Sequence, residues 1–104
     1  MRVKNMKSYK GNYVPNQFII SRAVISLPDD TYTGEAFQSY DNIIALKAFE
    51  CCNTGNCYRV FLDRRFWNYS RATGKYRNQF LGETKKKTDK KIKSGEYKLA
   101  DLNK

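Results

Sequence analysis

Residues 43–49 read Ile-Ile-Ala-Leu-Lys-Ala-Phe, and residues 58–62 read Tyr-Arg-Val-Phe-Leu. Both stretches are rich in the β-branched and aromatic side chains that favour strands. The connection between them contains Asn53, Gly55 and Asn56, which tolerate the positive φ angles of tight turns. The pattern predicts a β-hairpin, and the expected fold is built outward from it.

Two further segments with extended character precede this hairpin. Residues 17–27 contain the triplets Phe-Ile-Ile and Ala-Val-Ile and predict a strand, which the Pro-Asp-Asp sequence at 28–30 ends in a turn. Residues 31–40 are ambiguous, because Gly34 weakens a regular element, whereas Tyr32, Phe37 and Tyr40 could alternate on an extended edge. Residues 1–16 are polar and predict an irregular arm.

Downstream of the hairpin the pattern becomes helical. Ser and Thr accept hydrogen bonds from the first N–H groups of a helix, and Gly readily adopts the left-handed conformation that ends one. Two such pairs frame the expected helices: Ser70 with Gly82, and Thr84 with Gly95. We therefore expect one helix over about residues 71–81 and a second over about residues 85–94.

Together these elements predict an α+β protein. We expect an antiparallel sheet of three to four strands, mainly from residues 17–62, followed by two short basic C-terminal helices packed against it or at its edge. A chain of 104 residues suits a single core. The expected organisation is a polar N-terminal arm at residues 1–16 and a single α+β domain at residues 17–104, with apolar tail residues returning to the sheet.

Charge is distributed unevenly along the chain. Residues 64–104 carry 13 Lys and Arg against 4 Asp and Glu, whereas residues 1–63 carry 7 against 6. The formal net charge of +10 is therefore a property of the C-terminal region. Segregated positive charge with interleaved aromatic residues is typical of proteins that bind polyanions, above all nucleic acid.

The composition excludes several kinds of site. No apolar run is long enough for a secretory signal or a membrane span, so we expect a cytoplasmic protein without membrane contact. The chain has no His, its glycines occur singly, and its acids, Asp41, Glu50 and Asp63 among them, match no catalytic spacing. We expect those acids on the surface, and we expect no catalytic residue, no enzyme activity, no cofactor and no metal.

Three cysteines lie close together, at positions 51, 52 and 57. A zinc site would need a fourth ligand, which only carboxylate or water could supply, since the chain has no His and no other Cys. A bridge between Cys52 and Cys57 is geometrically conceivable, but an odd cysteine in a reducing compartment argues against it. Reduced thiols near a turn are the favoured interpretation.

The candidate binding residues are basic and aromatic. Eleven cations predict contacts with nucleic acid or an acidic partner: Arg64, Arg65, Arg71, Lys75, Arg77, Lys85, Lys86, Lys87, Lys90, Lys91 and Lys93. Three aromatic residues are candidates for base stacking: Trp67, Tyr69 and Tyr76. For these three, packing in the core is the favoured alternative, and the lysines could instead simply solvate an exposed helix.

One resemblance rests on a string of residues between Ser39 and Leu102. Its parts are Ser39-Tyr40, Ile43-Ile44-Ala45, the hairpin, Trp67-Asn68-Tyr69-Ser70 with Thr73 and Lys75, Phe80-Leu81, the lysine-rich helix and Gly95-Glu96-Tyr97. This string resembles a family of small proteins of bacteriophages and mobile elements of Gram-positive bacteria, some of which form domains of anti-CRISPR proteins. The resemblance implies a phage or mobile-element origin.

Three functional hypotheses follow from the resemblance and the charge. The first is a host-defence antagonist, an anti-CRISPR protein that inhibits a CRISPR effector nuclease by binding the enzyme or its guide RNA or DNA through a basic surface. The second is a regulatory protein that binds DNA or RNA. The third is a binder of small signalling nucleotides, whose phosphates would meet Arg64, Arg65 or Arg71.

Overall fold

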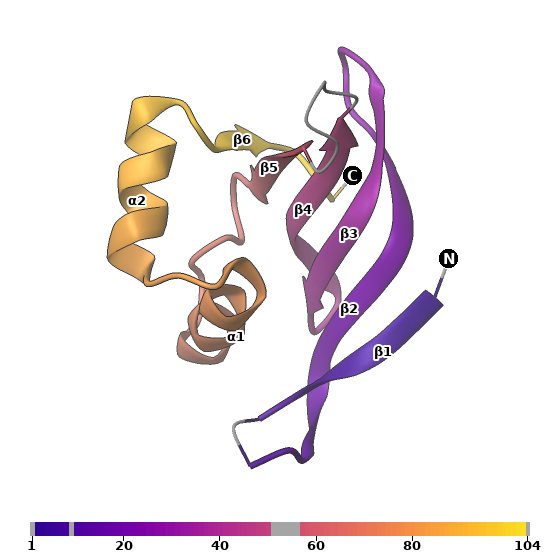
Figure 1. Cartoon of the computed structure of the whole chain (residues 1–104), viewed down its shortest axis with the longest axis vertical. Helices are drawn as coiled ribbons and strands as arrows, with labels where there is room; N and C mark the ends of the chain where they lie inside the picture. The colour runs from indigo at the N-terminus through magenta and orange to yellow at the C-terminus, as the bar shows by residue number, and fades with distance from the viewer. Residues whose placement is uncertain (1, 9, 51–56, 104) are drawn as a thin grey trace.

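A computed structural model describes residues 2–8, 10–50 and 57–103. Its elements are β1 (Arg2–Lys7), β2 (Tyr13–Ser26), β3 (Thr31–Ser39), β4 (Asn42–Glu50), β5 (Cys57–Asp63), α1 (Arg71–Leu81), α2 (Lys85–Ser94) and β6 (Lys98–Ala100). The described residues form a six-stranded sheet in the order β1-β2-β3-β4-β5-β6, with both helices on one side of it (Figure 1). The expectation of three to four strands was therefore wrong.

The predicted hairpin is confirmed. β4 and β5 pair in antiparallel fashion, and the register runs from Ala45 opposite Leu62 to Phe49 opposite Tyr58. β2 confirms the predicted strand at residues 17–27, although it begins earlier, at Tyr13. The proposed turn residues 53–56 and the side chains of the three cysteines lie outside the described part of the chain.

The missed strands include β1. It pairs with β2 in antiparallel fashion, so residues 1–16 are not an irregular arm but contain β1 and the start of β2. Met6 is the one buried residue of β1. Strand pairing uses backbone groups, which every residue other than Pro supplies, so an outer strand can be polar in sequence.

The ambiguous segment 31–40 forms the regular strand β3, which lies not at an edge but inside the sheet, between β2 and β4. Gly34 lies opposite Ala48 in the β3–β4 pair, and a Cβ atom there would clash with the carbonyl oxygen of Lys47. The glycine that seemed to weaken this segment is thus required by its pairing, because close backbone approach leaves no room for a side chain.

β6 is the sixth strand, and it pairs with β5 in parallel. Parallel neighbours need a long crossover connection, which α1 and α2 provide. The two helices are therefore not the C-terminal end of the fold, and the sheet is mixed. Asn103 holds the tail beyond β6 against β4, since its side chain accepts from the Ile43 N–H at 2.6 Å and donates to the Ile43 carbonyl at 2.7 Å.

Apolar residues cover both faces of the sheet. The helix-side cluster joins Phe37, Ala45 and Leu62 of the strands to Tyr76 and Phe80 of α1. The opposite cluster contains residues of β2 to β5 together with Leu102 from the tail. β2 bends around this second face (Figure 1), helped by a bulge at Arg22, whose φ is 57°.

Asp63 was expected on the surface and is instead 2% exposed. One carboxylate oxygen accepts from the N–H groups of Arg65 and Phe66, at 3.1 and 3.0 Å. The other accepts from the Leu102 N–H at 2.9 Å. A buried carboxylate is stable only where hydrogen-bond donors surround it. These donors come from the turn after β5 and from the tail, so the Asp63 side chain holds both in place.

Candidate nucleic-acid interface

α1 begins and ends where the sequence predicts. The Ser70 hydroxyl accepts from the Thr73 N–H at 3.1 Å, and Gly82 has the left-handed φ of 70°. The Thr73 hydroxyl lies 2.9 Å from that of Ser39 on β3, which ties the first turn of the helix to the sheet. Capping determines the bounds of this helix, and its apolar face and Thr73 determine its position.

Arg77 is not available to a nucleic acid. Its side chain is 1% exposed, and its guanidinium donates to the Trp67 carbonyl at 2.6 Å and to Asn68 Oδ1 and Asn78 Oδ1 at 3.2 and 2.9 Å. The Trp67 ring lies 5.2 Å from it. Burial lowers the pKa of Arg77 below its ordinary value. This cation holds α1 to the loop before it, so its assignment as a binding residue was wrong.

The three aromatic candidates are placed differently. Tyr76 is 7% exposed and belongs to the helix-side core. Trp67 is half-buried, packs against that core and faces Arg77. Tyr69 is 42% exposed and makes an edge contact with Phe66. Packing therefore accounts for Tyr76 and Trp67, as the favoured alternative predicted, and only Tyr69 of the three offers an open ring.

α2 also has its predicted bounds, but it is attached to the protein quite differently. Thr84 caps its first turn and Gly95, with φ 86°, ends it. The structure describes all ten of its residues, and Thr88 alone is buried. Few apolar contacts hold this helix, so polar ones must position it.

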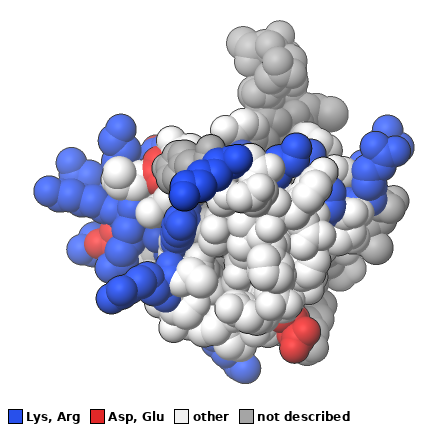
Figure 2. Space-filling model, turned by 90° about the horizontal axis from the view of Figure 1, so that it is seen from below, with Lys and Arg blue, Asp and Glu red and all other residues white. Residues whose placement is uncertain are grey.

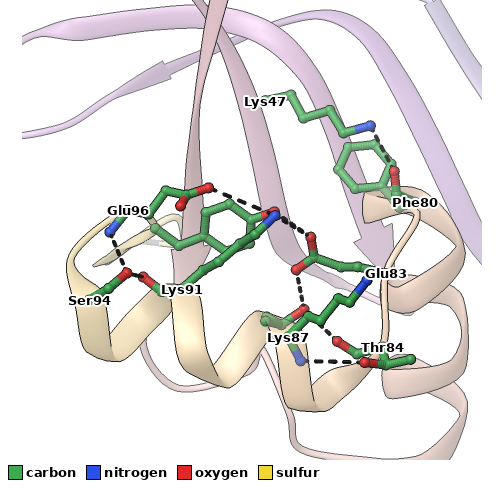
Figure 3. Close-up of polar contacts among 10 residues, drawn as sticks. Lys47, Phe80, Glu83, Thr84, Lys87, Lys91, Ser94 and Glu96 are labelled. Atoms are coloured by element: carbon green, nitrogen blue, oxygen red, sulfur yellow. Dashed lines mark hydrogen bonds and ion pairs between the residues drawn. The ribbon is translucent and has the colours of Figure 1, made fainter.

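Glu83, just before α2, supplies those polar contacts (Figure 3). Its carboxylate accepts from the Thr88 hydroxyl at 2.6 Å, the Tyr97 hydroxyl at 2.8 Å and the Lys91 ammonium at 2.8 Å. Burial by itself would raise the pKa of Glu83, but the hydrogen bonds from Lys91, Thr88 and Tyr97 outweigh it and hold the pKa below its usual value. Burial and then the bond to Glu83 raise the pKa of Tyr97 to about 12.

Lys91 is thus a structural cation. It pairs with Glu83 and lies 3.8 Å from Glu96, and the hydrogen bond to Glu83 raises its pKa. Lys93 makes an exposed ion pair with Asp89 at 3.3 Å. Such an exposed pair contributes little and opens easily to another anion.

The remaining candidate cations are exposed. They are Arg64, Arg65, Arg71, Lys75, Lys85, Lys86, Lys87, Lys90 and Lys93. Figure 2 shows Lys and Arg side chains gathered on the side of the molecule where α2 lies, while the broad face beside them carries few charges. We call the five exposed lysines of α2 the lysine surface: Lys85, Lys86, Lys87, Lys90 and Lys93.

Three of these lysines stand where the helix itself disfavours them. Lys85, Lys86 and Lys87 form the first turn of α2, which contains no acidic residue. The N-terminal end of a helix carries partial positive charge, so cations there destabilise the helix and an anion nearby stabilises it. Helix stability therefore does not explain this placement.

Comparison with known proteins places the chain in a family. The family pattern matches residues 1–96. The chain belongs to DUF8033, a family of unknown function. No curated protein and no solved structure matches it. Membership in DUF8033 carries no activity with it, so function must be argued from the residues.

The described part of this DUF8033 chain contains no group of three or more Cys, Asp or Glu residues that could hold a metal ion. Neither α1 nor α2 is long and apolar enough to cross a bilayer.

Sequence reasoning missed three residues on the predicted hairpin, Lys47, Phe49 and Tyr58. The Lys47 ammonium donates to the Phe80 carbonyl at the end of α1, at 2.7 Å (Figure 3), and lies 5.9 Å from the Tyr58 ring centre. Phe49 and Tyr58 are both exposed. Strand alternation could have found them, because it puts Lys47 and Phe49 on the same face of β4.

Proposed function

We propose that this chain is a cytoplasmic, non-enzymatic protein that binds nucleic acid through the lysine surface of α2. The observation that carries the proposal is the first turn of α2, where Lys85, Lys86 and Lys87 are exposed and oppose the helix dipole. Phosphate groups would relieve that repulsion. Arg64, Arg65, Arg71 and Lys75 are exposed as well and can extend the contact.

The test is the salt dependence of binding. If the five lysines of the lysine surface each meet a phosphate, log affinity should fall with log salt concentration with a slope of roughly −3.5 for a single strand to −4.5 for a duplex. Fluorescence anisotropy with labelled oligonucleotides of mixed sequence, at several salt concentrations, measures this slope. Absence of salt-dependent binding to any single strand or duplex would refute the proposal.

A charge-matched pair of variants locates the contact. Neutralising Lys86, Lys87 and Lys90 to Gln should make the slope shallower by about 2 to 3. The control neutralises Lys4, Lys7 and Lys10, which are exposed on or near β1, at the far edge of the sheet from β6. The control should leave the slope unchanged, and an equal loss in both variants would mean that net charge alone drives binding.

The sequence hypothesis of a host-defence antagonist becomes a special case of this proposal. A CRISPR effector nuclease loaded with guide RNA or DNA presents phosphates that the lysine surface could engage. The support is the sequence resemblance together with the exposed charge. Nuclease cleavage assays with guide-loaded and guide-free enzyme test it: inhibition lost in the Lys86, Lys87, Lys90 variant supports it, and undiminished cleavage with the wild-type chain refutes it.

A further inference from the structure

Two large aromatic side chains lie open to solvent at the end of the β4–β5 pair. Phe49 is 65% exposed and Tyr58 is 57% exposed, and they stand directly opposite each other in the register. Directly opposed residues have Cβ atoms about 5 Å apart, so the two side chains are neighbours on one face of the sheet. Single exposed hydrophobic residues are ordinary, but a paired Phe and Tyr on one sheet face points to a contact.

This pair lies on the helix side of the sheet. Ala45, Lys47 and Phe49 alternate along one face of β4, and Ala45 belongs to the core beneath the helices. Lys47 confirms the direction, because its ammonium reaches the Phe80 carbonyl of α1. The aromatic pair and α2 are therefore on the same side of the sheet.

An open cleft lies between Tyr58 of β5 and Lys91 of α2. Its volume is about 380 Å³, and it lies between β5 and the segment from α2 to β6. Its lining consists of Tyr58, Arg59, Val60, Lys91, Glu96 and Tyr97. Glu96 is the acidic member of the lining and lies 3.8 Å from Lys91, whose ammonium also pairs with Glu83 at 2.8 Å, and Arg59 is the second cation of the lining. Tyr58 joins this cleft to the aromatic pair, and Lys91 joins it to α2, the helix that carries the lysine surface.

We infer that Phe49 and Tyr58 form a stacking platform for the bases of single-stranded nucleic acid. The inference rests on the proposed function and names its substrate class. Proteins that bind single strands combine a cationic path for the backbone with exposed rings on which bases stack. The Lys47 ammonium, 5.9 Å from the Tyr58 ring centre, adds positive charge beside that ring. A duplex keeps its base faces stacked on one another, so it gains nothing from these rings.

The experiment compares variants that remove rings without changing charge. Phe49→Leu, Tyr58→Leu and the double variant are measured against labelled 12-nucleotide single-stranded DNA, the same sequence as RNA, and a duplex of equal length. The matched control is Tyr13→Leu, since Tyr13 is 69% exposed but sits at the β1–β2 turn, at the other end of the molecule (Figure 1). Circular dichroism and thermal unfolding verify the fold of every variant.

The expected result is a loss of single-strand affinity of about 5-fold or more for each ring removed. The salt slope should stay at its wild-type value, because no cation is lost, and duplex affinity and the Tyr13 control should not change. The DNA and RNA arms identify which single strand binds more tightly. Unchanged single-strand affinity in the double variant, or an equal loss with duplex, overturns the platform while leaving the salt-dependent binding of the proposed function intact. No binding by the wild-type chain overturns both.

Discussion

α1 and α2 are of nearly equal length, and both are basic, yet they differ in how many cations they expose, since α1 exposes Arg71 and Lys75 and α2 exposes five lysines. α1 buries Arg77 among three hydrogen-bond acceptors and a tryptophan ring, so that its charge serves the fold. α2 keeps five lysines exposed and turns Lys91 toward Glu83. A count of basic residues therefore does not measure a binding surface. The direction in which each side chain leaves its helix decides whether the charge is available to a partner.

The largest expected effect tests the internal role of Arg77. Arg77→Met should lower the free energy of unfolding by about 2 to 4 kcal/mol, because it leaves the buried acceptors, above all the Trp67 carbonyl, without donors. Urea denaturation measures the change. Arg71→Met on the same helix is the matched control, and since Arg71 is exposed it should change stability by less than about 0.5 kcal/mol. Equal losses of stability in the two variants would contradict a structural role that Arg77 has and Arg71 lacks.

The next effect concerns the attachment of α2. Glu83→Gln should lower the free energy of unfolding by about 1 to 3 kcal/mol at neutral pH, because it weakens the bonds from Lys91, Thr88 and Tyr97. Glu96→Gln is the control, since the Glu96 side chain is 62% exposed. Thermal or urea unfolding at pH 7 compares the two variants with the wild type.

The pH dependence of the same variant gives a second readout. The pKa of Glu83 lies below its ordinary value of 4.5. The carboxylate therefore stabilises the fold above about pH 4.5, and this contribution is lost as the pH falls through the lower pKa of the folded state. Between about pH 5 and pH 3 the Glu83→Gln variant should lose less stability than the wild type. Parallel curves for the two proteins would show that Glu83 does not hold α2 electrostatically.

The smallest expected effect is a difference in stability between charge reversals at the two ends of α2. Lys87→Glu places an acid at the third helical position after Thr84, completing a capping box and favouring the dipole, and should raise stability by about 0.3 to 1 kcal/mol. Lys93→Glu, in the last turn, should lower stability by a similar amount. Both variants should weaken nucleic-acid binding. In Lys87→Glu, therefore, stability should rise while binding weakens. A Lys87→Glu variant that is less stable than the wild type would remove the dipole argument.

The sequence predicted some features correctly because their causes are local. Ser70 and Thr84 bond to groups three residues away, and Gly82 and Gly95 adopt a conformation that any other residue finds costly, so both helices have the predicted bounds. The β4–β5 hairpin follows from two apolar runs close together. In each case the interacting residues lie close together in the sequence, so a short segment contains all the information needed.

The errors share a different cause. β1 is held by backbone pairing with β2, which leaves little trace in side chains, and Gly34 owes its place to the opposing Lys47 carbonyl. The burial of Asp63 depends on Leu102, 39 residues away. Each depends on a partner distant in sequence, and composition within a segment carries no information about that partner.

By itself the sequence determined the two helices, the central hairpin and the concentration of positive charge after residue 63, since caps, turns and charge act over a few residues. Only the tertiary structure decided which charges face water. It buried Arg77, paired Lys91 with Glu83, left the lysine surface open and set Phe49 beside Tyr58 on an exposed face. The physical reason is that exposure depends on what the fold places over a side chain, and contacts between residues distant in sequence determine that.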